Sequence, residues 1–185
     1  FQDFEIYLGK WGDPMPLEIK DWEGDYIISY LSRWIIPGYI LERAKKAAIN
    51  FHPASPDYPG IGCNNFALYD EAEFFGVTCH YMSPKVDTGP IIKIKKFPVF
   101  ASDSVSSLLS RTYDFQLILF YEMLGKILRN EKLPLSTKKW TRKPYTRQEL
   151  NELDNITKDM DAKEIKKRKR ATYFEEWIEK GKQSS

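Results

Sequence analysis

Residues 47–53 read AAINFHP, and the rest of the chain is interpreted around this stretch. Its short apolar start predicts a buried strand that ends near His52, because apolar runs of this length are typical of central strands. Side chains alternate along a strand, so Asn50 and His52 should share one face while Phe51 turns into the core. Open α/β sheets bind their ligands at the carboxyl ends of strands. An amide and an imidazole at that end therefore indicate a functional site.

A second motif, VDTGPII at residues 86–92, follows a loop at residues 53–62 that is rich in proline and glycine. The prolines disfavour a helix in this loop, which leaves its backbone free to wrap a ligand. Asn-x-His-Pro followed in order by Val-Asp-x-Gly-x-Ile-Ile resembles the folate-dependent formyltransferases, and the likeness extends over residues 25–99. The resemblance implies an N-formyltransferase with a catalytic triad of Asn50, His52 and Asp87.

These residue types suit formyl transfer, in which an amine must lose a proton and a carbonyl oxygen briefly carries charge. A neutral imidazole titrates near working pH, so we assign the proton transfer to His52. The Asn50 amide can donate to the charged oxygen. Asp87 can hold the imidazolium, in a loop where Gly89 permits backbone angles that other residues avoid. Taken singly, each side chain fits a cap or a core position better, and it is their combination in this order that favours a site.

The resemblance also implies N10-formyltetrahydrofolate as the formyl donor, with no metal. In the family, the segment that matches residues 32–35 lines the folate pocket through backbone groups that read the pterin edge. An alternative interpretation is an apolar loop that plugs the sheet, because ring pockets and ordinary loops share this composition. The predicted donor-binding residues are Ser32, Arg33, Trp34, Ile35, Pro84, Lys85 and Val86.

The acceptor has to be inferred from residues outside these two motifs. In the family, glycinamide ribonucleotide enzymes end soon after the core, and methionyl-tRNA enzymes carry a larger C-terminal barrel. The enzymes that formylate a dTDP-linked amino-dideoxysugar, a precursor of O-antigen or another surface glycan, have a short extension, as this chain does. A nucleotide sugar needs cations for its diphosphate and an aromatic face for its base. The predicted contacts are Lys10, Trp11, Tyr58, Gly60, Arg170 and Tyr173.

Two other functions remain open. One is the phosphoribosylglycinamide formyltransferase reaction of purine synthesis. The other is a formyltransferase-like binding domain without catalysis, which is made plausible because the strand-helix unit that the resemblance implies before residue 4 is not found. The basic run at residues 166–170 fits two interpretations. It can supply Arg170 as a cation for the diphosphate, or it is a solvated helix end next to the favourable end of the helix dipole, and the second explains it at least as well.

Length and composition predict a globular protein with one sizeable core. The chain has 185 residues, of which 42% are hydrophobic and 15% aromatic. We expect a catalytic domain over residues 1–132 and a small C-terminal extension over residues 133–185. The formal charge of +2 is too small to predict nucleic-acid binding. Two cysteines, Cys63 and Cys79, make neither a disulfide framework nor a zinc cluster, and no apolar run is long enough to span a bilayer. We therefore expect a cytoplasmic protein. A homodimer is possible.

The expected fold class is α/β, with a Rossmann-like, mostly parallel sheet flanked by helices. Strands are predicted at residues 4–8, 25–30, 47–52, 77–82 and 92–95. Helices are predicted at residues 37–46, from a cap at Asn64 or Asn65 to Gly76, and from residue 102 to about residue 130. Thr146 with Glu149, and Asp161 with Glu164, are spaced as capping boxes. His80 and Cys79 alternate on the strand at 77–82, so we interpret His80 as a core or supporting group.

Overall fold

The computed structural model describes residues 3–174, in which four strands form one sheet in the order β1-β2-β3-β4. The strands are β1 (Gly24–Tyr30), β2 (Ala44–His52), β3 (Phe74–Tyr81) and β4 (Ile91–Pro98). β1 pairs with β2 in parallel, whereas β3 is antiparallel to both β2 and β4. Three of the four strands therefore run in the same direction, and the predicted α/β fold with a mostly parallel sheet is confirmed.

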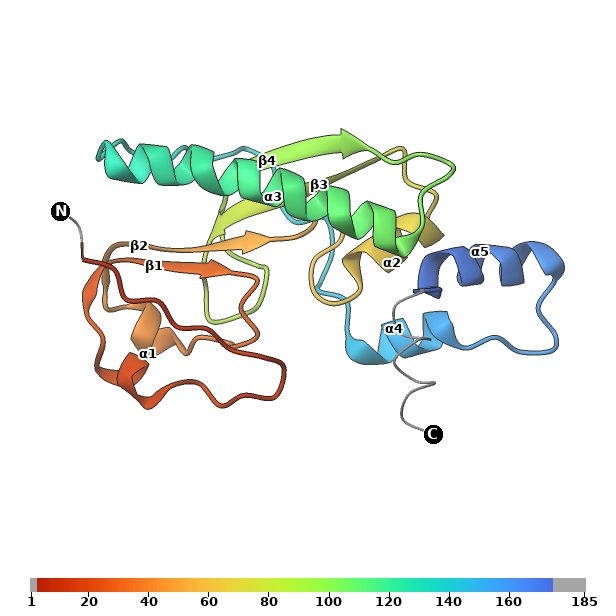
Figure 1. Ribbon diagram of the computed structural model, residues 1–185, viewed down its shortest axis with the longest axis horizontal. Coiled ribbons are helices and arrows are strands. Elements are labelled where there is room, and N and C mark those ends of the chain that lie inside the picture. Colours follow the sequence, from red (N-terminus) through yellow and green to blue (C-terminus); the bar gives the residue numbers. More distant parts are fainter. Residues whose placement is uncertain (1–2, 175–185) are drawn as a thin grey trace.

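The helices surround this sheet unevenly. They are η1 (Leu17–Asp21), α1 (Gly38–Leu41), α2 (Cys63–Tyr69), α3 (Val105–Leu128), α4 (Arg147–Asp154) and α5 (Ala162–Thr172). Figure 1 shows α3 crossing the sheet in front of β3 and β4, while α2, α4 and α5 gather beyond one end of it. Within residues 3–174, no helix is both long and apolar enough to cross a membrane.

The core lies between the sheet and α3. Phe51 of β2 and Cys79 of β3 are buried in the same cluster as Leu119 and Met123 of α3, as the predicted alternation along β2 requires. The buried Gln116 amide donates a hydrogen bond of 2.6 Å to the Phe51 carbonyl, which ties α3 to the end of β2. The core therefore fixes the strand end that carries the candidate catalytic side chains.

Two elements predicted from local patterns differ in the structure. Residues 3–10 form no strand, although Phe4, Ile6 and Leu8 alternate, and all three side chains are exposed. A strand needs a partner for its backbone groups, and no strand pairs with this segment among the described residues. The helix predicted at 37–46 ends at Leu41, because β2 already begins at residue 44 and pairs with β1.

The cap predicted for α2 is also wrong. The residue before the helix is Gly62, whose left-handed backbone (φ 71°) precedes Cys63 without a side-chain cap. The Asn64 amide instead donates to the Thr112 hydroxyl at 3.0 Å, and the Asn65 amide donates to the Ala171 carbonyl at 2.6 Å. Both amides therefore join α2 to other helices, and the helix ends at Tyr69 rather than at Gly76.

The segment after α3 packs onto the same core. Thr146 and Asp161 accept hydrogen bonds from the backbone N–H of Glu149 and Glu164, as the spacing predicts. Leu153 of α4 and Ala171 of α5 are buried in the main hydrophobic cluster. The boundary between residues 132 and 133 stays a prediction, and residues 175–185 of the predicted extension lie outside the described part of the chain.

Asp103 is expected to contribute strongly to stability, because its carboxylate is buried and fully paired. Arg111 binds it through two nitrogens, at 2.7 Å and 2.9 Å, and the Phe100 N–H donates to it at 2.7 Å. These donors hold the pKa of Asp103 at about 2. Asp103→Asn should lower the free energy of unfolding by about 1.5–3 kcal/mol, the range for hydrogen bonds to charged groups. Urea denaturation at neutral pH measures this loss.

The pH dependence provides a second readout for Asp103. Its folded pKa lies below the unfolded value of about 3.9, so the stabilisation is present above pH ~4 and is lost as the pH falls toward 2. The difference in stability between wild type and Asp103→Asn should therefore shrink over that window. Asp114→Asn, at an exposed acid on α3, is the matched control and should change stability little. Equal losses in the two variants would contradict the role of Asp103.

Candidate active site

The structure brings the three predicted catalytic side chains to one place. Asn50 and His52 end β2, and Asp87 lies in the loop between β3 and β4. The His52 Nδ1 atom is 3.3 Å from the Asp87 Oδ2 atom. Both side chains are buried, with 4% of His52 and 6% of Asp87 exposed.

His80 joins these residues into one cluster. The register of β2 and β3 pairs Asn50 directly with His80, and residues opposite each other across a sheet point to the same face. The Asn50 Nδ2 atom is 3.1 Å from the His80 Nε2 atom, which is also 3.4 Å from the Asp87 Oδ1 atom. The contact agrees with the interpretation of His80 as a core or supporting group, and only the strand register reveals that Asn50 is the residue it supports.

The hydrogen bonds assign a tautomer to His80. Its Nδ1 atom lies 2.8 Å from the Tyr81 carbonyl oxygen, which can only accept, so Nδ1 carries the hydrogen. In the neutral ring, Nε2 then accepts a hydrogen bond from the Asn50 NH2 group. Since an NH2 group has two hydrogens, Asn50 keeps a second donor for another acceptor. His80 thus orients the amide that was predicted to bind an oxyanion.

The loop at residues 53–62 contacts two of the candidate catalytic side chains, His52 and Asp87. The Tyr58 carbonyl accepts a hydrogen bond of 3.1 Å from His52 Nε2, and the Gly60 N–H donates one of 2.8 Å to Asp87 Oδ2. Tyr58 and Gly60, predicted to contact substrate, therefore support His52 and Asp87 through their backbone groups. A substrate contact by either residue stays a prediction.

The backbone around Asp87 corrects the role expected of Gly89. It is Asp87, with φ 47°, that adopts the left-handed conformation, and Gly89 is not among the residues with positive φ. A Cβ atom at Gly89 would lie 1.8 Å from the Tyr81 carbonyl oxygen. Gly89 is therefore required for close approach of two backbones. That approach places the Asp87 loop against the end of β3.

The pKa values of both His52 and Asp87 lie below their ordinary values. Burial lowers the pKa of the His52 imidazole below its ordinary value, and this outweighs the opposing effects of Asp87 and the Tyr58 carbonyl. Burial alone would raise the pKa of Asp87, but His52, His80 and the Gly60 N–H hold it below its ordinary value. The resting cluster therefore combines a carboxylate with a neutral imidazole, which can accept a proton near neutral pH.

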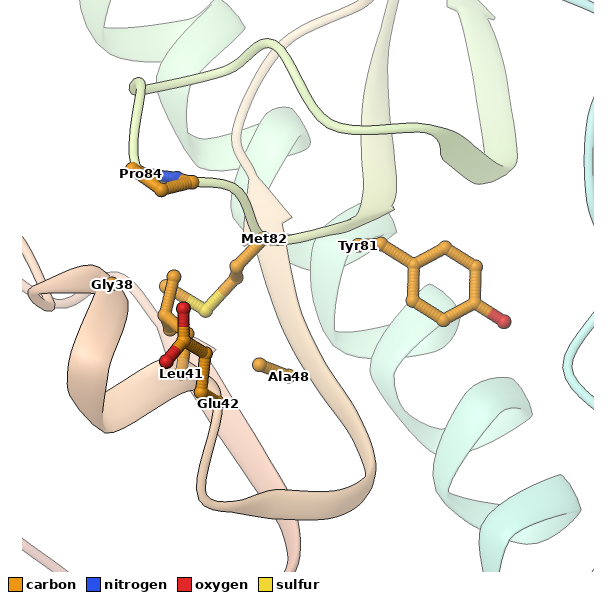
Figure 2. Close-up of a pocket in the computed structure, with 7 residues that line it drawn as sticks. All are labelled: Gly38, Leu41, Glu42, Ala48, Tyr81, Met82 and Pro84. Atoms are coloured by element: carbon orange, nitrogen blue, oxygen red, sulfur yellow. The ribbon is translucent and has the colours of Figure 1, made fainter.

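A cavity of about 280 Å³ lies next to this cluster, close to the lower end of the range for small-molecule sites, roughly 300–1,000 Å³. Figure 2 shows the side chains of Leu41, Glu42 and Met82 gathered between α1 and β2, with Pro84 above them. The Met82 N–H donates a hydrogen bond of 2.8 Å to the Ala48 carbonyl, which ties two walls of the cavity together. Ala48 is two residues before Asn50, so the cavity borders the catalytic strand end. Its lining residues are Gly38, Leu41, Glu42, Ala48, Tyr81, Met82 and Pro84.

Of the predicted donor-binding residues, Pro84 alone is among those that line this cavity. The Trp34 Nε1–H donates to the Asp13 carbonyl at 3.0 Å, and Ser32 accepts a hydrogen bond from the Trp34 N–H. Ile35 is 70% exposed, and Val86 is about half exposed. The Lys85 carbonyl accepts hydrogen bonds from the hydroxyls of Ser83 and Thr88. The donor-binding roles of residues 32–35, 85 and 86 stay predictions.

The remaining predicted substrate contacts fall in two places. The Lys10 N–H binds the Asp13 carboxylate in the N-terminal segment. Trp11 is 72% exposed, and the guanidinium groups of Arg33 and Arg147 lie 5.8 Å and 5.9 Å from its ring.

Arg170 is already engaged, because its guanidinium donates to the carbonyls of Phe100 and Asp103. Tyr173 is exposed beyond the end of α5. Within residues 3–174, neither residue is hydrogen-bonded to Asn50, His52, His80 or Asp87. Their substrate roles stay predictions, and Arg170 would have to exchange backbone partners to bind an anion.

The sheet, the buried Asn-His-Asp cluster and the adjoining cavity together define the class of protein. Residues 15–124, more than half of the chain, match the family model described as formyl transferase, and the chain belongs to this family. Within the family, the chain is 32% identical over 95 residues to a methionyl-tRNA formyltransferase of Listeria innocua. It is 31% identical over 86 residues to the phosphoribosylglycinamide formyltransferase of Escherichia coli. These alignments cover 51% and 46% of this chain.

Solved structures with the same fold include sugar-modifying members of the family. An N-formyltransferase from Helicobacter canadensis superposes with a TM-score of 0.71 at 23% identity, over 88% of this chain and 61% of that one. A 4-N formyltransferase from Francisella tularensis gives a TM-score of 0.71 at 20% identity, over 85% of this chain and 66% of that one. At these identities the likeness concerns the fold. The chain spans 30% of the Listeria protein and 40% of the Escherichia coli protein.

Proposed function

We propose that this protein transfers a formyl group from N10-formyltetrahydrofolate to the amino group of a dTDP-linked amino-dideoxysugar. The observation that carries the formyl transfer is the buried cluster in which His52 lies 3.3 Å from Asp87 and Asn50 is held by His80. Acyl transfer to an amine needs a proton acceptor and a donor to the developing oxyanion. The cluster supplies both on one strand end.

Each side chain has one task in the proposed reaction. The amine attacks the formyl carbon, and the Asn50 hydrogen that His80 does not use donates to the carbonyl oxygen as it becomes negative. The His52–Asp87 pair takes the proton that the amine loses. The Nδ1 atom of His52 faces Asp87, so protonation at Nδ1 turns their contact into a charge-assisted hydrogen bond. When the tetrahedral carbon collapses, the C–N bond to the folate breaks, and the folate nitrogen takes up the proton that the His52–Asp87 pair received from the amine.

We infer that the cavity beside β2 holds part of the formyl donor. Its apolar walls, Leu41 and Met82, suit a flat heteroaromatic ring, and the Glu42 carboxylate can accept from ring N–H groups. The Helicobacter canadensis protein was solved with folinic acid and dTDP-3-aminofucose, which supports a folate donor for this fold. Residues 32–35 remain proposed donor-binding residues, since Gly38, which lines the cavity, is three positions after Ile35 in the sequence.

Ala48→Leu tests this assignment, because the longer side chain protrudes into the cavity. A mismatch of a methylene or more in an apolar pocket costs a ligand about 1–3 kcal/mol, so KM for the folate should rise roughly five- to 150-fold while kcat at saturation changes little. Initial rates at varied donor concentration measure the change. Ala101→Leu, on an exposed turn, is the matched control. An unchanged KM in Ala48→Leu would remove the cavity from donor binding.

The choice of acceptor rests on separate support. Trp11 is an exposed aromatic ring next to the guanidinium groups of Arg33 and Arg147, a combination that suits a base and its diphosphate. The fold of sugar N-formyltransferases also extends over 88% of this chain, beyond the stretch matched by the family model. The sequence relatives instead act on methionyl-tRNA and phosphoribosylglycinamide, which makes these the alternative acceptors.

A direct assay separates the acceptors. The full chain is incubated with N10-formyltetrahydrofolate and, in parallel, with dTDP-amino sugars, phosphoribosylglycinamide or methionyl-tRNA, and each product is identified by mass spectrometry. Turnover with a dTDP-amino sugar, at a higher kcat/KM than with the other two, is expected. Preference for phosphoribosylglycinamide or methionyl-tRNA would overturn the sugar acceptor but not formyl transfer. A folded chain that binds folate and formylates none of them would favour a binding domain.

A further inference from the structure

Trp140 covers the catalytic histidines, although it lies far from them in the sequence. Its ring centroid is 5.7 Å from that of His52 and 5.0 Å from that of His80, with interplanar angles of 71° and 88°. Its Nε1–H donates a hydrogen bond of 2.8 Å to the Gly89 carbonyl. One side chain therefore contacts both imidazoles and the loop that carries Asp87.

The segment that follows Trp140 is bound to the loop on the other side of the cluster. The Thr141 N–H donates to the Pro56 carbonyl at 3.2 Å, and the Tyr145 N–H donates to the Pro59 carbonyl at 2.8 Å. In return, the Ile61 N–H donates to the Tyr145 carbonyl at 3.1 Å. A side chain at Gly60 could not fit, because its Cβ atom would lie 2.4 Å from the Tyr145 oxygen.

This loop supplies the backbone groups that hold the two catalytic side chains. The Tyr58 carbonyl accepts from His52, and the Gly60 N–H donates to Asp87. Residues 140–145 thus fix the cluster from two directions, through Gly89 and through the loop at 56–61. A segment predicted as an appendage is continuous with the catalytic site.

We propose that Trp140 is a positioning residue of the active site, which fixes the Asp87 loop through its Nε1–H and shields His52 and His80 from water with its ring. It acts on catalysis through these three residues. The kinetic part of the proposal rests on the proposed formyl transfer. The effect on the histidines does not, because it is a property of the protein without substrates.

The shielding has a measurable consequence. Burial lowers the pKa of His52, so opening the site to water should let it rise toward its ordinary value of about 6.5. The titratable groups that face His52 are Asp87 on its loop, His80 on β3 and Cys63 on α2, whose Sγ atom lies 3.7 Å away. Burial raises the pKa of the Cys63 thiol to about 12, so this group stays neutral throughout the range.

The histidines can be observed directly, because the chain contains two of them and Trp140 contacts both. The full chain, labelled with 13C-histidine, is titrated by NMR through the Cε1–H signals. Trp140→Ala should raise the titration midpoint of His52 by on the order of 1 pH unit, while Trp140→Phe, which keeps an apolar ring, should leave it near the wild-type value. Trp22→Ala, which removes a tryptophan beside Gly24, is the control and should not shift either histidine.

Kinetics separate the hydrogen bond from the ring. Trp140→Phe loses the donor to Gly89, so kcat should fall about five- to tenfold, as a lost hydrogen bond of ~1 kcal/mol implies, with KM for the folate unchanged. In Trp140→Ala, the acid limb of the kcat/KM profile should move to higher pH by the same amount as the NMR midpoint. Urea denaturation confirms that each variant is folded, and if Trp140→Ala is not, Trp140→Leu replaces it.

Three outcomes would overturn the proposal. They are an unchanged His52 midpoint in folded Trp140→Ala or Trp140→Leu, an equal shift in Trp22→Ala, and wild-type kcat in Trp140→Phe. If the wild type transfers formyl to no acceptor, the proposed function fails, and the NMR titration alone still decides the shielding by Trp140.

Discussion

His52→Ala should lower kcat by roughly 10²–10⁴, the contribution of a positioned general base. The imidazole is buried between Asp87 and the Tyr58 carbonyl, with a pKa lowered by burial, so it is neutral and able to accept the amine proton near pH 7. His80 should not replace it, because its Nε2 atom accepts from the Asn50 amide and its Nδ1 hydrogen is held by the Tyr81 carbonyl, whereas the Nδ1 atom of His52 faces the Asp87 carboxylate, which stabilises an added proton.

Single-turnover rates with saturating donor and acceptor measure this loss without interference from product release. Lys45→Ala, an exposed change on the same strand, is the control and should keep wild-type kcat. Denaturation curves must show that His52→Ala is folded, since the substitution leaves a small buried gap. A folded His52→Ala variant that retains more than about a tenth of the rate would show that another group accepts the proton.

Asn50→Ala has the second largest expected effect, a loss of roughly 10²–10³ in kcat, as for other donors to an oxyanion. One hydrogen of its NH2 group is directed to His80, and the other is available to the formyl oxygen. Because this bond strengthens as the oxygen becomes charged, KM for the donor should change little while kcat falls.

The Asn50→Ala experiment distinguishes transition-state stabilisation from ground-state binding. Asn151→Ala, an exposed amide in the middle of α4, serves as the matched control and should be neutral. Asn50→Asp is informative as well, because a carboxylate can only accept and would face the Asp87 charge across His80. If Asn50→Ala raises KM and leaves kcat intact, the amide binds the donor and takes no part in stabilising the oxyanion.

Much of the fold, and the residues of the candidate site on β2, could be predicted from the sequence. The apolar run before Asn50 specified a buried strand, and the capping box at Thr146 and the N-cap at Asp161 marked two helix starts, because these signals act within a few residues. The alternation around Phe51 separated the core face from the site face for the same local reason.

The predictions that failed needed partners distant in the chain. The alternating segment at residues 3–10 has the pattern of a strand, but a strand requires a neighbouring backbone, which the pattern does not specify. Asn64 and Asn65 are good caps by composition, yet Thr112 and the Ala171 carbonyl compete for their amides. In both cases tertiary contacts overrode a local preference.

The sequence by itself determined that Asn50 and His52 share one face of a buried strand, because strand alternation is fixed by backbone geometry alone. The tertiary structure decided which groups meet them. The register of β2 and β3 brought His80 to Asn50, close backbone approach at Gly89 set the Asp87 loop, and the fold of residues 140–145 placed Trp140 over both imidazoles. These contacts join residues up to 88 positions apart, as with His52 and Trp140. No local pattern encodes them, because they form only when the whole sheet and its loops have packed.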